Sequence, residues 1–202
     1  HAKEDWMAVA DLHFGFEVRR RAMGGLWPMW GMETIAERLE SLVSDYRPET
    51  LVLVGDVVDS GHAPREAVTF LDTIADLGPE LVLVEGNHDR GLVRRHRRWV
   101  DHWVTDSCFF HHGHLDSETF EQLRRAGKTE ISGHQHPSIN FGDGAGTSLR
   151  LPSLATEQLP SHARWTLPAF SPWAGGTRYE PDDIEHEVKL YACSRQRVFE
   201  AC

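Results

Sequence analysis

The chain has 202 residues, a formal net charge of −10 and three cysteines. This length suits one domain with a substantial core, and three widely spaced cysteines argue against a disulfide framework and favour a reducing cytoplasm. No apolar run is long enough to cross a bilayer, which argues against a membrane protein. No signal peptide is evident at the start. The first residue is His1 and not Met, which is compatible with the removal of a leader.

The first predicted strand is Trp6–Ala10, an apolar run that stops at Asp11-Leu12-His13. An aromatic, glycine-rich loop, Gly24–Gly31, follows a short way downstream. If Trp27 and Trp30 are exposed in this loop, they offer a platform for a substrate. The alternative is that they cover the hydrophobic core.

Two amphipathic helices are predicted on either side of a fully apolar strand. Residues Glu33–Asp45 and Arg65–Leu77 both carry apolar side chains at helical spacing. Between them, Leu51–Val54 is apolar at every position, as expected for a strand buried on both faces of an α/β sheet. It runs directly into Gly55-Asp56-Val57-Val58-Asp59. This strand therefore delivers two carboxylates at its C-terminal end, where open α/β sheets bind their ligands.

Three further strands are predicted to end in polar clusters in the same way. They are Leu81–Glu85 before Gly86-Asn87-His88-Asp89, Cys108–Phe110 before His111-His112-Gly113-His114, and Thr129–Ser132 before Gly133-His134-Gln135-His136. Oxygen and imidazole donors without thiolate suit Mn, Fe, Zn or Mg. Any one of these residues could instead be a hydrogen-bonded turn residue or a buried core histidine. Five clusters in succession at strand ends favour a metal site.

The remainder of the chain is predicted to be richer in strands. Arg90–Trp103 is interpreted as an irregular helix, and Ser117–Ala126 as a short helix with Ser117 as its N-cap. Short strands follow at Ser148–Leu151, Trp165–Phe170, Glu187–Tyr191 and Arg197–Glu200, the last two forming a hairpin. We find no repeat and no linker, so residues 1–202 are predicted to form a single domain, with an α/β first half and a β-rich second half packed sheet on sheet.

Arginines are concentrated directly after the polar motifs. They lie at Arg19–Arg21 and at Arg90, Arg94, Arg95, Arg97 and Arg98. The guanidinium fork suits phosphate, although solvated helix faces are an equally simple explanation. The acidic net charge argues at first sight against nucleic acid, but several acids belong to the candidate ligand set, where cations would neutralise them.

In order, the motifs Asp-x-His, Gly-Asp-x-x-Asp, Gly-Asn-His-Asp, His-Gly-His and Gly-His-x-His resemble those of the calcineurin-like metallophosphoesterase superfamily. The resemblance spans Asp11 to His136. It implies an α/β fold, a four-layer αββα sandwich of two mixed sheets flanked by helices, with two divalent metal ions at the sheet edge. Two such ions clamp the attacking and leaving oxygens of a phosphoryl displacement and acidify a shared water into hydroxide, which attacks phosphorus.

Carried over motif by motif, the resemblance implies a role for each site residue. One metal would take Asp11, His13, Asp56 and His136, and the other would take Asp56, Asn87, His112 and His134, with Asp56 bridging. His88 would assist the leaving group as general acid or transition-state stabiliser, oriented by Asp59. The doublet His111-His112 leaves the choice of imidazole open from the residues alone, and the family pattern indicates His112.

A finer resemblance lies in Asp11–Glu17, Gly133–Ile139 and Leu167–Gly176, which are similar to the DNA-ligase-associated branch of these phosphoesterases. Members of that branch are typically manganese-dependent phosphodiesterases or nucleases associated with bacterial and archaeal DNA repair. The resemblance implies a phosphodiester substrate such as single-stranded DNA, and association with DNA ligase or helicase repair proteins. Arg90 and Arg94 would then contact phosphates, and Trp27 and Trp30 would stack bases.

Three functions from different classes follow from these observations. The first is a metal-dependent phosphodiesterase or nuclease, favoured by the finer resemblance and the arginines. The second is a phosphomonoesterase acting on nucleotides or phosphoproteins, favoured by the acidic balance. The third is a non-catalytic scaffold of the same fold. The presence of His88 and Asp59 beside every expected ligand argues against a scaffold.

Overall fold

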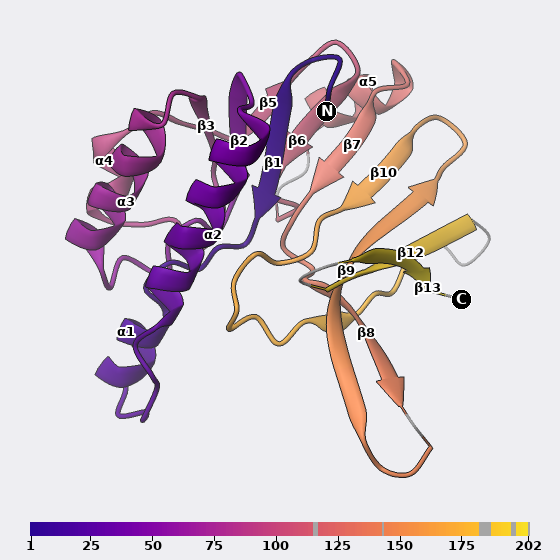
Figure 1. Ribbon diagram of the computed structural model, residues 1–202. Coiled ribbons are helices and arrows are strands. Elements are labelled where there is room, and N and C mark those ends of the chain that lie inside the picture. Colours follow the sequence, from indigo (N-terminus) through magenta and orange to yellow (C-terminus); the bar gives the residue numbers. More distant parts are fainter. Residues whose placement is uncertain (115–116, 143, 182–186, 195–196, 202) are drawn as a thin grey trace.

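Two β-sheets lie face to face in the computed structural model, which describes residues 1–114, 117–142, 144–181, 187–194 and 197–201 (Figure 1). In these residues the first sheet has four strands, ordered β1-β2-β3-β4 and all parallel. The strands are β1 (Trp6–Ala10), β2 (Thr50–Val54), β3 (Glu80–Val84) and β4 (Trp99–Val100).

The outer face of the first sheet is covered by the long helices α2 (Gly31–Tyr46) and α3 (Pro64–Asp76). Their buried faces carry the apolar periodicity seen in the sequence, with Ile35 from α2 and Ile74 from α3 both fully buried in this core. Two short helices, α1 (Phe16–Ala22) and α4 (Leu92–His96), follow the strand-end motifs of β1 and β3. No helix of the described residues is long and apolar enough to span a membrane.

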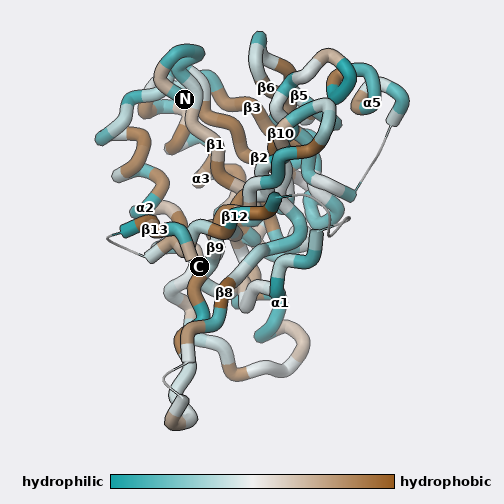
Figure 2. Tube along the Cα trace, turned by 90° about the vertical axis from the view of Figure 1, so that its right-hand side faces the viewer, coloured by the Kyte–Doolittle hydropathy of each residue, from teal (hydrophilic) through white to brown (hydrophobic). Residues whose placement is uncertain are grey.

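Strand β2 shows why an uninterrupted apolar run is needed here. Leu51 and Leu53 point into the core under the helices, while Val52 and Val54 point into a second core between the two sheets. The second core also contains Phe110 and other residues of the facing sheet. Figure 2 shows hydrophobic stretches along β2 and β3, as expected for parallel strands covered on both faces.

The second sheet has nine strands in the described residues and mixes parallel with antiparallel pairs. They are β5 (His102–Val104), β6 (Cys108–His111), β7 (Thr129–Ser132), β8 (Pro137–Gly142), β9 (Ser148–Gln158), β10 (Ala163–Thr166), β11 (Thr177–Arg178), β12 (Glu187–Cys193) and β13 (Val198–Ala201). Helix α5 (Glu118–Arg125) covers the outer face, where the ring centroids of Phe120 and Phe109 lie 5.9 Å apart. The layer order is therefore helices, sheet, sheet, helix, which confirms the predicted αββα sandwich.

Several predicted elements are confirmed within one or two residues. Helix α5 begins where Ser117 Oγ accepts a hydrogen bond from the backbone N of Phe120, so Ser117 is the predicted N-cap. Strands β12 and β13 pair antiparallel, with Tyr191 opposite Glu200, as the predicted hairpin requires; its residues 195–196 lie outside the described part. The single domain over residues 1–202 stays a prediction.

Two predictions are wrong, and one helix was missed. Arg90–Trp103 is helical only in the five residues of α4, because its β-branched and aromatic residues pair in β4 and β5, with Val100 opposite Val84. The predicted strand Trp165–Phe170 ends at Thr166, and its remainder crosses to β1, where Phe170 N donates to Ala10 O at 2.8 Å. Helix α1 was not predicted.

Strand β9 continues well beyond the predicted end at Leu151. Pro152 is the last residue of β9 that pairs with β8, and Ser153 is the first that pairs with β12. Proline has no N–H to donate, so it fits the position at which one strand exchanges one partner for another.

Candidate metal centre

The first group of candidate ligands joins the two sheets. Asp11 and His13 follow β1, whereas His136 follows β7. His136 Nε2 lies 3.1 Å from Asp11 Oδ1 and 3.3 Å from His13 Nε2. One donor atom from each of the three residues lies within 4.8 Å of the other two, so a single cation can reach all of them.

A second group lies beside the first and is formed by Asp56 after β2, His112 after β6 and His134 after β7. His112 Nε2 lies 3.3 Å from Asp56 Oδ2. The same carboxylate oxygen is 3.8 Å from Nε2 of His13, which belongs to the first group. Asp56 therefore borders both groups, and this is the position that a bridging carboxylate needs.

The tautomer of His112 tests whether these residues fit a metal ion. Its Nδ1 is 3.1 Å from the carbonyl oxygen of Val54, so Nδ1 carries the hydrogen and Nε2 offers a lone pair. Nε2 is buried and has no hydrogen-bond partner among the described residues. A buried lone pair directed at a carboxylate is unfavourable alone and favourable with a cation between them, so the donor set fits divalent metal.

The backbone at this site is strained. Eight non-glycine residues among those described have positive φ, and five of them are candidate ligands. These five are Asp11 (φ 56°), His13 (47°), Asp56 (47°), His134 (73°) and His136 (48°). A side chain in this region costs free energy, of the order of 1–3 kcal/mol for each residue, and such residues cluster at functional sites.

Two glycines allow the strand ends to approach each other closely. A Cβ on Gly55 would lie 2.2 Å from Nδ1 of His112, and Gly55 itself has φ of 73°. A Cβ on Gly86 would lie 2.1 Å from the backbone N of Asp56. Any side chain at either position would push His112 or Asp56 out of the cluster.

Asn87 lies at the exposed rim of the site, directly before His88. The backbone N of His88 donates to Asp56 Oδ1 at 2.8 Å, which holds this loop against the cluster. Burial alone would raise the pKa of Asp56, but the neighbouring His112 imidazole and the hydrogen bond from the His88 amide lower it to about 2. The carboxylate that borders both groups is therefore ionised.

His88 and Asp59 form the pair expected from the sequence. His88 Nδ1 is 3.1 Å from Asp59 Oδ1, and Arg19 Nε donates to the other oxygen, Oδ2, at 2.6 Å. Burial would raise the pKa of Asp59, but hydrogen bonds from His13, His88 and Arg19 hold it well below its usual range. The hydrogen bond to Asp59 raises the pKa of His88.

The doublet His111-His112 separates onto opposite faces of the second sheet, as successive strand residues do. His112 joins Asp56 and His134, whereas His111 Nε2 faces Glu130 Oε1 at 2.8 Å. Glu130 is buried and also accepts hydrogen bonds from Arg124, His162 and Arg164. His111 therefore belongs to a buried ionic cluster beneath α5 and not to the metal centre.

Arg19 and Asp89 support the site but were not assigned roles from the sequence. Asp89 is buried and accepts hydrogen bonds from Val58 N at 2.9 Å and Gly86 N at 2.8 Å, so it ties the loop after β2 to the loop after β3. Burial raises its pKa to about 7. The place of Asp89 at the end of Gly-Asn-His-Asp could have indicated its role. The pairing of Arg19 with Asp59 spans 40 residues, and the sequence does not indicate it.

The predicted substrate contacts differ in their surroundings. Trp30 is 43% exposed, whereas Trp27 is half-buried and packs edge-on against the half-buried rings of Phe16 and Trp173. Arg90 is exposed and donates to the carbonyl oxygen of Asn87 at 3.3 Å, and Arg94 is ion-paired with Glu85 through both of its terminal nitrogens.

Two facing sheets with carboxylate and imidazole groups at their shared edge define a metal-dependent phosphoesterase, a hydrolase. Residues 7–143 match the sequence profile of the family described as calcineurin-like phosphoesterase, and the chain belongs to that family. A comparison with curated proteins gives no match.

Two solved structures resemble the chain in fold. The nuclease MPE of Pseudomonas putida is 24% identical with a TM-score of 0.67, over 98% of this chain and 88% of that one. The phosphoesterase Yfce from E. coli is 18% identical with a TM-score of 0.53, over 96% of this chain and 95% of that one. At these identities the likeness establishes the fold and leaves the substrate to be argued from the site.

Proposed function

We propose that this protein is a phosphodiesterase that cleaves nucleic acid, with single-stranded DNA as its polymer substrate. The observation that carries this proposal is that two of the arginines beside the motifs are already paired with carboxylates. Arg19 is committed to Asp59 and Arg94 to Glu85. A phosphomonoester dianion rewards additional free cations at its oxygens, whereas a diester carries one charge and needs open space instead. Arg90 and Arg94 stay candidate phosphate contacts, but Arg94 must first leave Glu85.

The candidate ligands for one metal are Asp11, His13, Asp56 and His136, and those for the other are Asp56, Asn87, His112 and His134. Divalent cations held there would lower the pKa of water and offset the charge on the phosphate. His88 has Nδ1 directed at Asp59, so Nε2 is the ring nitrogen left to give its proton to the leaving oxygen. Asp59, held in place by Arg19, keeps the imidazole in that orientation and stabilises its protonated form.

We propose manganese as the metal, because members of the DNA-ligase-associated branch that the sequence resembles are typically manganese-dependent. The oxygen and imidazole donors, without thiolate, also suit Fe, Zn or Mg. The finer sequence resemblance to the DNA-ligase-associated branch supports a role in DNA repair, alongside ligase or helicase proteins. The similar structure from P. putida is that of a nuclease, which agrees with the proposed cleavage of nucleic acid. The free thiols of Cys108 and Cys193 support a cytoplasmic location.

The test compares bis(4-nitrophenyl) phosphate, 4-nitrophenyl phosphate and single-stranded DNA, each with Mn, Mg and Zn. We expect the diester to be hydrolysed faster than the monoester with manganese, and DNA to be nicked in a salt-sensitive manner. The Asp56→Asn variant serves as the inactive control. If the monoester is the better substrate and DNA stays intact over long incubation, the protein is a phosphomonoesterase instead.

A further inference from the structure

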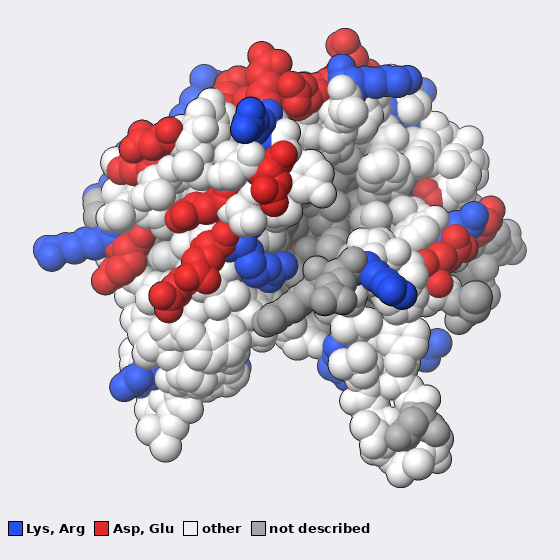
Figure 3. All heavy atoms as spheres, in the orientation of Figure 1, with Lys and Arg blue, Asp and Glu red and all other residues white. Residues whose placement is uncertain are grey.

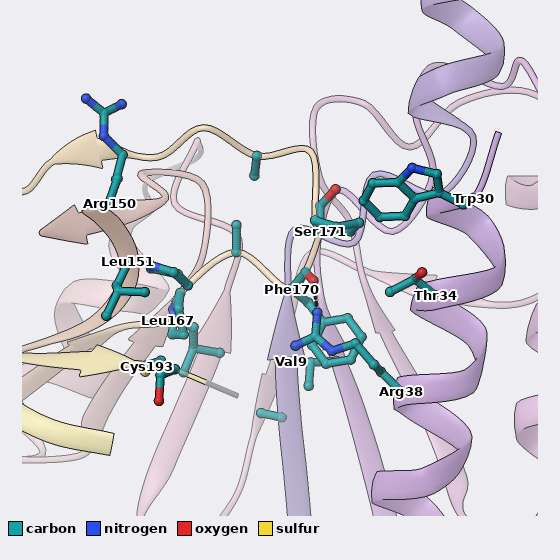
Figure 4. Close-up of a pocket in the computed structure, with 17 residues that line it drawn as sticks. Val9, Trp30, Thr34, Arg38, Arg150, Leu151, Leu167, Phe170, Ser171 and Cys193 are labelled. Carbon is teal, nitrogen blue, oxygen red and sulfur yellow. Dashed lines mark hydrogen bonds between the residues drawn. The ribbon is translucent and has the colours of Figure 1, made fainter. Parts of the chain in front are cut away.

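Two adjoining cavities lead away from the candidate metal centre. The smaller, of about 260 Å³, is lined by the candidate ligand His136 and by Arg150, Gly175 and Gly176. The larger, of about 550 Å³, extends to Trp30 and Arg38 on the other side. Both cavities are lined by Arg150, Pro152, Ala169 and Ala174. Because they share these four residues, the two cavities adjoin and together form a groove from His136 to α2. Figure 4 shows the larger cavity, from Arg150 to Trp30 and Arg38.

Arg150 stands where the two cavities meet. Its Nε donates to Asn140 Oδ1 at 2.8 Å, and its Nη1 donates to the carbonyl oxygens of Gly175 and Gly176 at 3.2 and 3.3 Å. All three acceptors are neutral, and no carboxylate pairs with Arg150 in the described part of the chain. The guanidinium is thus fixed in position beside the smaller cavity while its charge stays uncompensated, unlike that of Arg19 or Arg94.

The far end of the groove combines a second guanidinium with aromatic surface. Arg38 donates from Nη1 to the carbonyl oxygen of Phe170 at 3.0 Å, and its Cζ lies 4.3 Å from the centroid of the Phe170 ring. Figure 4 shows Arg38 and Trp30 on the same side of the larger cavity, both reaching from α2 and its N-terminal flank. Trp30 is supported by Trp173, whose ring centroid is 4.2 Å away, so it is held as a platform.

The distribution of charge agrees with a polyanion in this groove. Figure 3 shows a hollow between the helical and β-rich sides of the molecule, with Lys or Arg side chains on both of its flanks. Acidic side chains lie on both sides of this face, and most of them are over the helical side. Cations on both flanks of the hollow suit the phosphates of a nucleic-acid strand. The aromatic ring of Trp30 would suit one of its bases.

We infer that the groove from His136 to Trp30 binds the strand flanking the scissile phosphate, with Arg150 on the adjacent phosphate, Arg38 on a further phosphate and Trp30 stacked on a base. This inference rests on the proposed nuclease function. It predicts discrimination between a polymer and a small diester, since a small diester would occupy the metal centre without reaching Arg38 or Trp30.

The experiment measures kcat/KM for a single-stranded oligonucleotide and for bis(4-nitrophenyl) phosphate with manganese, at several NaCl concentrations. In Arg150→Gln we expect the ratio of polymer to small-diester kcat/KM to fall about tenfold. The slope of log kcat/KM against log salt for the polymer should become shallower by about 0.7, the value for one phosphate contact to a single strand. Arg150→Lys should retain the slope, because it retains the charge.

Arg125→Gln is the matched control, because Arg125 is exposed on α5 over the outer face of the second sheet. Its ratio and slope should equal those of the wild type. Since Arg150 also holds the 175–176 turn, Trp30→Leu provides an independent test and should lower the ratio about tenfold through lost stacking.

The outcomes separate this inference from the proposed function. A wild-type enzyme that hydrolyses the small diester but never the oligonucleotide overturns both. Cleavage of the oligonucleotide with wild-type ratio and slope in both Arg150→Gln and Trp30→Leu overturns the groove alone. A lower ratio in Trp30→Leu supports the groove even if Arg150→Gln proves unstable.

Discussion

Arg19 donates a hydrogen bond from Nε to the buried carboxylate of Asp59 at 2.6 Å, and the opposite oxygen of that carboxylate faces His88. The three side chains come from α1, the loop after β2 and the loop after β3. The guanidinium of Arg19 thereby fixes the carboxylate of Asp59, and this carboxylate in turn fixes the imidazole of His88. We therefore predict that Arg19 is a positioning residue, which acts on the reaction through Asp59 and His88.

Replacing Arg19 by Gln should lower kcat about tenfold for a diester with a poor leaving group, because His88 loses its fixed orientation. The loss should be smaller for a nitrophenyl leaving group, which needs less protonation, and metal content should not change. Arg19→Lys should recover part of the activity. Arg21→Gln, an exposed change on the same helix, is the control, and equal losses for both leaving groups would contradict the positioning role.

If Asp56 bridges two metal ions, its replacement should lower both the metal content and the activity of the protein. Asp56→Asn should abolish activity and lower the metal content measured by mass spectrometry, because both ligand groups lose a shared anionic oxygen. His13→Ala removes a ligand from one group only, so its activity should fall less and partly return with excess manganese. Full metal content in Asp56→Asn would argue against a bridge.

His88 lies next to the metal centre, and its replacement should separate chemistry from metal binding. His88→Asn should lower turnover by about 10²–10⁴-fold with a poor leaving group and by less with an activated aryl leaving group. The variant should retain its metal. Loss of metal would instead make His88 a ligand, and a uniform loss for both leaving groups would indicate electrostatic stabilisation.

The buried cluster around Glu130 predicts a pH-dependent stability. Burial would raise the pKa of Glu130, but hydrogen bonds from His111 and Arg124 hold it well below its ordinary 4.5. A carboxylate with a lowered folded-state pKa contributes its full stability above about pH 4.5, and this is lost as the pH falls further. Glu130→Gln should lower the free energy of unfolding by about 3 kcal/mol at pH 7, since buried cations lose their partner.

The measurement is urea unfolding of metal-free protein in EDTA at a series of pH values. The difference between wild type and Glu130→Gln should be constant above pH 5 and shrink towards pH 3. Glu37→Gln, an exposed change on α2, should stay within about 0.5 kcal/mol of the wild type at every pH. A difference that is independent of pH would show that the ionised carboxylate contributes nothing.

Much of the fold was predictable because its signals are local. Apolar runs such as Leu51–Val54 that end in glycine and acids predict β2 and its neighbours, and α2 and α3 carry their periodicity in consecutive residues. The region Arg90–Trp103 was misassigned because its pairing partners, Val84 in β3 and Phe110 in β6, lie elsewhere in the chain. Tertiary pairing there outweighs local helix propensity.

The candidate site divides in the same way between local and distant information. The order of the motifs predicted which residues gather, and the structure brings Asp11, His13 and His136 together from positions more than 120 residues apart. The orientation of His112, the commitment of Arg94 to Glu85 and the reach of Arg150 depend on contacts between distant segments. The sequence could not predict these features, because a neighbouring residue often offers the same chemistry, as His111 does beside His112.

The positive φ angles at Asp11, His13, Asp56, His134 and His136 set the stability of the backbone against the side chains that a metal would need. Glycine would relax the backbone at each of these positions, yet glycine has no donor atom, so relief of strain and retention of function exclude each other. Stability must then come from elsewhere, from the apolar strands and helices that enclose these turns. Five strained turns gathered at one edge of the two sheets therefore mark this site independently of its sequence motifs.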